Sequence, residues 1–331
     1  MTFLRAILFS FAILWRLALV FPFMIVALVL VGIAASFVMV ILAFVSPVLT
    51  FVLALCFGVA ASVLPVIVGA RLGLQVKGAS TRNSYVGLLL PAIGYGLFEA
   101  ICVLLIVAGA MAVYLFATPL TLQDLAQLDS MEPALLAQQL GSVSPAIALS
   151  LLWVGSVLAL GLRAALLMPF AGASVGADPS GRAHTPFYGF GSEFLSMLIL
   201  VALSYILWAF SVPIAIVISG LLGFGDGLSA GMELLASVRG AGSLELPGVE
   251  AAVFFGMVLF MYLWGFSLQC AGGVLIYMNQ AEQVADQQNA FDMTMDDHLQ
   301  SMTGATPQPK REIQSADVME LIRSRMQNNQ K

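Results

Sequence analysis

The stretch that decides the fold covers residues 23–70 and reads FMIVALVLVGIAASFVMVILAFVSPVLTFVLALCFGVAASVLPVIVGA. It contains no Asp, Glu, Lys or Arg, and Ser46 and Pro47 near its middle are typical of a turn. About 20 apolar helical residues are enough to cross the hydrocarbon core of a bilayer. The stretch therefore predicts two membrane-spanning helices joined by a tight turn at Ser46 and Pro47.

The composition of the whole chain extends this prediction. The 331 residues are 60% hydrophobic and only 9% charged, whereas a soluble domain carries roughly 25% charged residues. Backbone groups in lipid must be hydrogen-bonded within the protein, and the apolar runs lack the alternation of a membrane barrel. We therefore expect an all-α fold, a polytopic membrane bundle of six transmembrane helices within residues 23–278. The six runs are residues 23–45, 48–70, 97–117, 145–168, 194–219 and 251–278.

The positive charges are distributed unevenly along the chain. Of the 13 Lys and Arg residues, all except Arg239 lie in the terminal segments or around the connections that follow the second and fourth runs. Positive charge close to a span is retained on the cytoplasmic side. This pattern predicts a multi-pass protein of the cytoplasmic (inner) membrane with both termini in the cytoplasm. The net charge of -5 offers no basic surface for phosphates, so we expect no nucleic-acid partner.

The segments outside the spans have distinct characters. We expect residues 1–22 to lie along the inner interface, separated from the first span by Pro22, with membrane lipid as their partner. The outer loop of residues 118–144 predicts two short amphipathic helices. Residues 279–331 are expected to form a cytoplasmic tail, with a linker at 303–309 and an amphipathic helix at 315–327.

The helix at 315–327 predicts a docking surface. Its apolar stripe consists of Val318, Leu321, Ile322 and Met326. A helix of this length is marginal alone in water, so the stripe must be buried against something. A protein partner or a second copy of the chain, giving a homo-oligomer, is the favoured occupant. The chain's own cytoplasmic loops and the membrane surface are the alternatives.

Two helical hairpins, residues 48–117 and 145–219, have a similar order of polar and turn-forming residues. In each, an Arg is followed by Gly-Ala-Ser, a second Arg, a Pro, Tyr-Gly and a Glu. This similarity suggests a duplicated unit. Both copies begin on the same side of the membrane, so the repeat would be parallel, whereas inverted repeats are the more familiar signature of transporters.

Each hairpin has an Arg near the end of its first span and a Glu near the start of its second. One interpretation pairs Arg71 with Glu99 and Arg163 with Glu193 along a polar path through the bundle. The favoured interpretation places these four side chains at the inner interface, where Arg reaches headgroups and Glu caps a helix. Arg163 is the best exception, because residues 164–170 after it are apolar or Pro and would place it about 10 Å inside the boundary. Gln269 lies inside the sixth run, and we favour a hydrogen bond between helices over a substrate contact.

Catalytic and metal-binding patterns are weak in this chain. Residues 172–176 match GxSxG, with Asp178 and His184 nearby, but a nucleophile elbow needs a strand before its serine. Asp and Met residues between 292 and 302 match no ligand geometry, because soft thioethers and hard carboxylates favour different ions. We therefore expect no catalytic residue, no metal and no cofactor.

Two functional hypotheses follow from these patterns. The favoured one is a non-enzymatic integral membrane protein that anchors or organises a membrane complex and presents a cytoplasmic docking helix. The alternative is a transporter or channel component with a polar path near Arg163 and Glu193. The two hypotheses differ in whether these side chains face a water-filled cleft within the bundle.

Overall fold

The computed structural model describes residues 2–79, 84–116, 145–223 and 248–303. Within these ranges the chain is helical and contains no strand, although Ala177 and Ala183 form an isolated bridge. The elements in chain order are α1 (Thr2–Ala43), α2 (Pro47–Val76), the short η1 (Val86–Leu88), α3 (Leu89–Phe116), α6 (Pro145–Val175), α7 (Phe194–Ala209), α8 (Ser211–Leu221) and α10 (Val249–Thr303).

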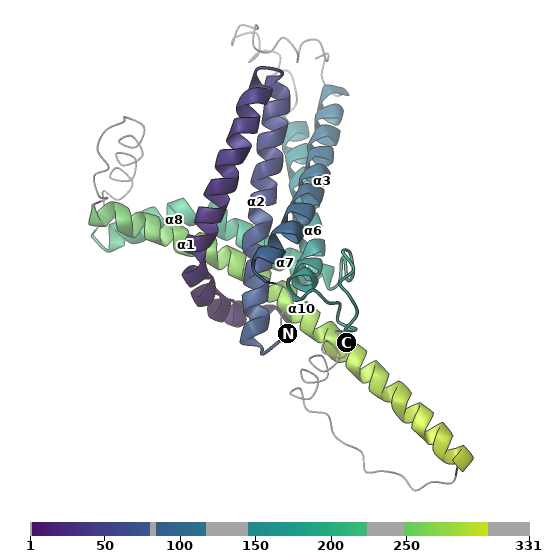
Figure 1. The fold of residues 1–331 in the computed structure, drawn as a ribbon. Coiled ribbons are helices and arrows are strands. Elements are labelled where there is room, and N and C mark those ends of the chain that lie inside the picture. The colour runs from purple at the N-terminus through teal and green to yellow at the C-terminus, as the bar shows by residue number, and fades with distance from the viewer. Residues whose placement is uncertain (1, 80–83, 117–144, 224–247, 304–331) are drawn as a thin grey trace. The chain divides into compact units, whose positions relative to one another are not determined.

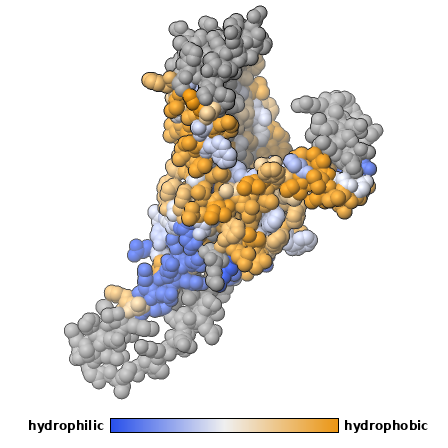
Figure 2. All heavy atoms as spheres, turned by 180° about the vertical axis from the view of Figure 1, so that it is seen from behind, coloured by the Kyte–Doolittle hydropathy of each residue, from blue (hydrophilic) through white to orange (hydrophobic). Residues whose placement is uncertain are grey.

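The described helices are those of a multi-pass membrane protein. Five of them are long and apolar enough to cross a membrane, and there are six spans if α7 and α8 are counted as one. In Figure 2, hydrophobic side chains cover most of the described helices, whereas hydrophilic ones gather towards the end of α10. Exposed apolar surface on this scale fits a lipid environment, because water would not solvate it.

The fifth apolar run differs from the single span that we expected. It forms α7 and α8, which meet at Phe210 and are bent by 54°. Pro213 lies in the first turn of α8 and has no N–H to donate to the carbonyl of Ala209, and in a continuous helix its ring would crowd that carbonyl. The run is therefore a broken span or a re-entrant pair of helices.

The first helix also differs from expectation, because it does not end at Pro22. α1 begins at Thr2 and continues through this proline to Ala43. Pro22 removes one backbone hydrogen bond, and the apolar residues on both sides of it continue the helix. The interfacial position of residues 1–22 remains a prediction. The parallel repeat of residues 48–117 and 145–219 also remains a prediction.

The chain forms two compact units. Unit 1 comprises residues 1–25, 65–88 and 165–331, and unit 2 comprises residues 26–64 and 89–164. In unit 2, α1 and α2 form the tight hairpin that the sequence predicts. Its turn is stabilised by Ser46, whose hydroxyl oxygen accepts the backbone N–H of Leu49 at 3.4 Å, directly before Pro47 opens α2.

The core of unit 1 forms where α2, α6 and α10 converge, and α7 and α8 pack beside α10 (Figure 1). Small residues allow this approach. A Cβ atom on Gly273 of α10 would lie 2.5 Å from the carbonyl oxygen of Leu167 on α6, and one on Gly73 of α2 would lie 2.8 Å from Ile13 of α1. The buried core residues are Ala70, Leu74, Ala171, Val175, Ala177, Val274 and Tyr277.

α10 continues well past the apolar run that the sequence indicates. It is a single helix of 55 residues from Val249 to Thr303 (Figure 1). From Asn279 onward its sequence is polar and rich in Gln. The sixth helix therefore continues past its apolar run and reaches the start of the predicted linker.

Candidate functional site

The most unusual polar feature of unit 2 is an ion pair between two helices. Arg163 on α6 donates from Nη1 to Oε2 of Glu99 on α3 at 2.5 Å. Both residues are buried, with Arg163 0% and Glu99 4% exposed. An isolated buried charge is costly in a medium of low dielectric constant, so each side chain requires the other.

The same guanidinium also contacts a third helix. Nη2 of Arg163 donates to the backbone carbonyl oxygen of Ser62 on α2 at 2.9 Å. The planar guanidinium offers five N–H donors in a fixed geometry, so one Arg can bond two acceptors on different helices. Arg163 therefore links α2, α3 and α6, and all three of these residues belong to unit 2.

This arrangement differs from both of our interpretations of the charged residues. The hairpin pairing joined Arg163 to Glu193, and the interfacial interpretation placed Glu99 at a helix cap. Instead α3 packs along α6, where a Cβ atom on Gly155 would lie 3.6 Å from Ile106, and this packing brings Glu99 to Arg163. Sequence separation within a hairpin does not determine which helices pack together, so the pairing could not be predicted from it.

The other charged residues of the predicted path have partners within unit 1. Glu193 is the residue directly before α7, has a left-handed backbone with φ of 48°, and makes no side-chain cap. Its Oε1 accepts from Nδ2 of Asn279 at 3.3 Å. Arg71 is buried, and its Cζ lies 4.2 Å from the centroid of the Tyr85 ring.

Gln269 forms the hydrogen bond between helices that we favoured. It is fully buried on α10, and its Nε2 donates to Oγ of Ser204 on α7 at 2.7 Å. The hydroxyl of Ser204 in turn donates to the carbonyl of Val201. This chain of bonds satisfies polar groups inside an apolar interface and joins α10 to α7.

The residues of the GxSxG match have structural contacts. Ser174 on α6 donates from Oγ to the carbonyl of Ala171 at 2.7 Å. The Asp178 carboxylate accepts from the backbone N–H of Thr185 at 3.0 Å and from its hydroxyl at 2.6 Å, and His184 Nδ1 lies 3.3 Å from it. Asp178 therefore fixes the connection between α6 and α7, a role that the sequence analysis missed.

The His184 imidazole is electrostatically perturbed in this connection. Burial lowers its pKa from the ordinary value of 6.5, and the Asp178 carboxylate partly opposes this effect. The neutral imidazole is therefore favoured in the folded protein.

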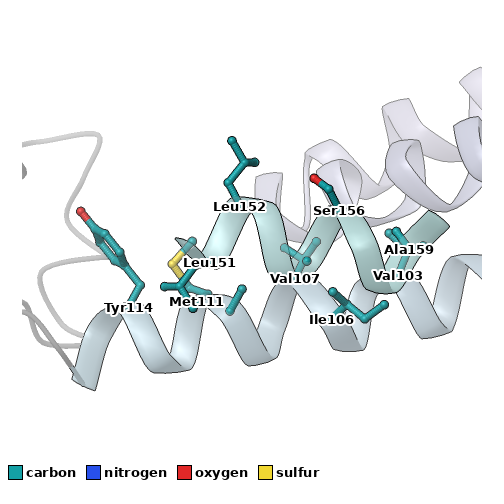
Figure 3. Close-up of a pocket in the computed structure, with 11 residues that line it drawn as sticks. Val103, Ile106, Val107, Met111, Tyr114, Leu151, Leu152, Ser156 and Ala159 are labelled. Atoms are coloured by element: carbon teal, nitrogen blue, oxygen red, sulfur yellow. The ribbon is translucent and has the colours of Figure 1, made fainter. Parts of the chain in front are cut away.

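An apolar groove follows the seam between α3 and α6 in unit 2. Its volume is about 490 Å³, and Figure 3 shows side chains of both helices along it, with Tyr114 at one end and Ala159 towards the other. Ser156 and Tyr114 contribute hydroxyls to its otherwise apolar lining. This groove has no signal in the sequence, because helices that are apolar on all sides give no sign of which faces pack.

The docking residues Val318, Leu321, Ile322 and Met326, and the outer-loop helices of residues 118–144, lie outside the described residues. Among the residues that the structure describes, no group of three His, Cys, Asp or Glu side chains is placed to hold a metal ion.

No family model, curated protein or solved structure matches the chain.

Proposed function

We propose that the protein is a non-enzymatic integral membrane protein that anchors or organises a complex at the cytoplasmic face of the inner membrane. In this proposal six spans cross the membrane, both termini lie in the cytoplasm, and the helix at 315–327 docks a protein partner. The charge distribution along the sequence supports this orientation.

The observation that carries the proposal is the length of α10. Only about 20 residues of a helix are needed to cross the bilayer, yet α10 has 55 residues. Residues 279–303 would extend roughly 38 Å beyond the apolar run at about 1.5 Å per residue. A continuous helix of this kind would hold the start of the linker that leads to the docking helix at a defined distance from the membrane surface.

The test introduces charge into the stripe. In the variant Leu321→Asp with Ile322→Asp, the stripe would lose its apolar face, and the size of the native complex in blue native electrophoresis should fall to that of the protein alone. The matched control, Asn328→Asp with Asn329→Asp, adds the same charge outside the stripe and should keep the complex intact. A complex of unchanged size in the first variant would contradict the proposal.

The second candidate is a transporter or channel component, and the buried pair of Arg163 and Glu99 favours it. Ionisable residues within apolar spans often line ion or substrate paths.

The anchoring and transport functions differ in whether water reaches the pair of Arg163 and Glu99. In a protein with Cys56, Cys102 and Cys270 replaced by Ala, the variant Ser62→Cys reports on that access through a hydrophilic thiol reagent. The anchoring function predicts no labelling from either side, whereas transport predicts labelling from at least one side.

A further inference from the structure

A pocket lined by both charged and apolar side chains lies in unit 1, where three segments of the chain meet. Its volume is about 500 Å³. α10 contributes Leu275, Met278, Asn279 and Glu282, and Lys77 directly follows α2. The start of α1 completes the lining with Arg5, Leu8, Phe9 and Ala12. Charged and apolar side chains therefore share one cavity.

The two cations of the pocket come from different elements. Lys77 Nζ lies 5.0 Å from the centroid of the Phe9 ring, a contact that holds the ammonium on the pocket wall. Arg5 contributes a guanidinium from α1. Both side chains are exposed, so both can bind a ligand that enters from the surface. Phosphate, like carboxylate, is an anionic group that Arg and Lys side chains recognise.

The α10 side of the pocket carries acceptors instead. Glu282 supplies an exposed carboxylate. Asn279 uses its Nδ2 to donate to Glu193, which leaves its carbonyl oxygen as an acceptor. A simple anion would be repelled by Glu282, so the lining fits a ligand that carries both a phosphate and a protonated amine.

The position of the pocket suggests the source of this ligand. Lys77 follows the apolar span that ends at Val76, and Asn279 marks the point where the sequence of α10 turns polar. The charged part of the pocket thus lies where helices leave their apolar runs, which is the depth of lipid headgroups in a membrane. Leu8, Ala12 and Leu275 give the pocket an apolar wall against which an acyl chain can pack.

We propose that this pocket binds the headgroup of a phosphatidylethanolamine. The phosphate is held by Arg5 and Lys77, and the ammonium donates to Glu282 and to the carbonyl oxygen of Asn279. Phosphatidylglycerol has no ammonium for Glu282, and the quaternary nitrogen of phosphatidylcholine has no N–H to donate. The pocket therefore distinguishes phosphatidylethanolamine from both of these lipids.

Native mass spectrometry of the delipidated full-length protein in detergent tests the site. The probes are phosphatidylethanolamine, phosphatidylcholine and phosphatidylglycerol with identical acyl chains. The wild type should bind phosphatidylethanolamine most tightly. Arg5→Gln and Lys77→Gln should each weaken its binding by about tenfold, the effect of losing one charge-assisted hydrogen bond. Glu282→Gln should reduce the preference for phosphatidylethanolamine over phosphatidylglycerol, because the neutral amide no longer attracts the ammonium by its charge.

The matched controls make the same change in charge at residues outside the pocket. Arg16→Gln on α1 and Asp286→Asn on α10 alter exposed residues outside the lining, and both should bind lipid as the wild type does. Equal affinity for the three lipids, or pocket variants that bind like the wild type, would overturn the proposal.

Competition with soluble compounds distinguishes a lipid from free phosphate. Glycerophosphoethanolamine should displace the lipid, whereas inorganic phosphate at the same concentration should not, because it lacks the amine. Displacement by inorganic phosphate with equal strength would assign the pocket to a soluble phosphate and contradict the lipid site.

Discussion

At the scale of single residues, Glu99 and Arg163 place two opposite charges within apolar helices. The pair bonds at 2.5 Å, and the carbonyl of Ser62 accepts a second N–H of Arg163. Removing one partner of a buried pair leaves the other charge uncompensated, which costs far more than the pair itself contributes. The stability of unit 2 should therefore depend on keeping both charges or removing both.

Glu99→Gln should lower the free energy of unfolding by about 3–5 kcal/mol, because Arg163 would remain buried without a counter-charge. The measurement is reversible unfolding in mixed detergent micelles. Glu193→Gln is the matched control, since its carboxylate makes a longer contact of 3.3 Å with Asn279, and it should change stability by less than about 1 kcal/mol. Equal losses in the two variants would contradict this role of the pair.

Replacing both charges provides a second check on the same pair. The double variant Glu99→Met with Arg163→Met should be about as stable as the wild type, because apolar side chains of similar volume can substitute for a buried ion pair. A double variant that is as unstable as Glu99→Gln would show that the two residues do not act as a pair.

His184 should make stability depend on pH. Because burial lowers its pKa below 6.5, its contribution is complete above that value and is lost as the pH falls towards the lowered pKa. The thermal unfolding midpoint should therefore fall between about pH 7.5 and about pH 5, and part of this fall should be absent in His184→Gln. Identical pH profiles of the two proteins would contradict the effect.

At the scale of elements, the approach of α10 to α6 depends on Gly273. A Cβ atom there would lie 2.5 Å from the backbone oxygen of Leu167, which cannot move aside as a flexible side chain can. Gly273→Ala should therefore destabilise the protein by about 1–3 kcal/mol.

Gly256 provides the matched control on the same helix. A Cβ atom at Gly256 meets no atom within 4 Å, so Gly256→Ala should be neutral or slightly stabilising through its higher helix propensity. Chemical unfolding of both variants measures the difference. Equal effects would contradict the close packing of α10 on α6.

The elements themselves could be predicted to different degrees from the sequence. The six apolar runs predicted the helices and most of their positions, because length and hydropathy are properties of the run alone. The break at Phe210 has a sequence signal in Pro213, which we did not weigh. The pairing of Arg163 with Glu99 has no such signal, because it depends on how α3 packs on α6 and these helices are apolar on most sides.

Prolines lie close to the boundaries of the two units in all three helices that pass between them. Pro65 begins the unit 1 part of α2, and Pro22 in α1 and Pro169 in α6 lie within about one turn of their boundaries. Proline weakens the helical hydrogen-bond pattern locally. The division of the chain within these three helices therefore coincides with locally weakened helical hydrogen bonding.

At the scale of the whole molecule, the account depends on apolar helices that cross the membrane with the positive residues on the cytoplasmic side. The docking helix, the extension of α10 and the headgroup pocket would all then lie at the inner face. The distribution of the 13 Lys and Arg residues supports this orientation, because Arg239 alone lies in a predicted outer loop.

Cysteine accessibility in intact cells tests this claim most directly. In a protein with Cys56, Cys102 and Cys270 replaced by Ala, a membrane-impermeant maleimide is applied to single-cysteine variants. The account predicts that Ser229→Cys is labelled in intact cells, and that Ser84→Cys, Ala183→Cys and Ser301→Cys are labelled only after the membrane is opened. Labelling of any of these three from outside would contradict it.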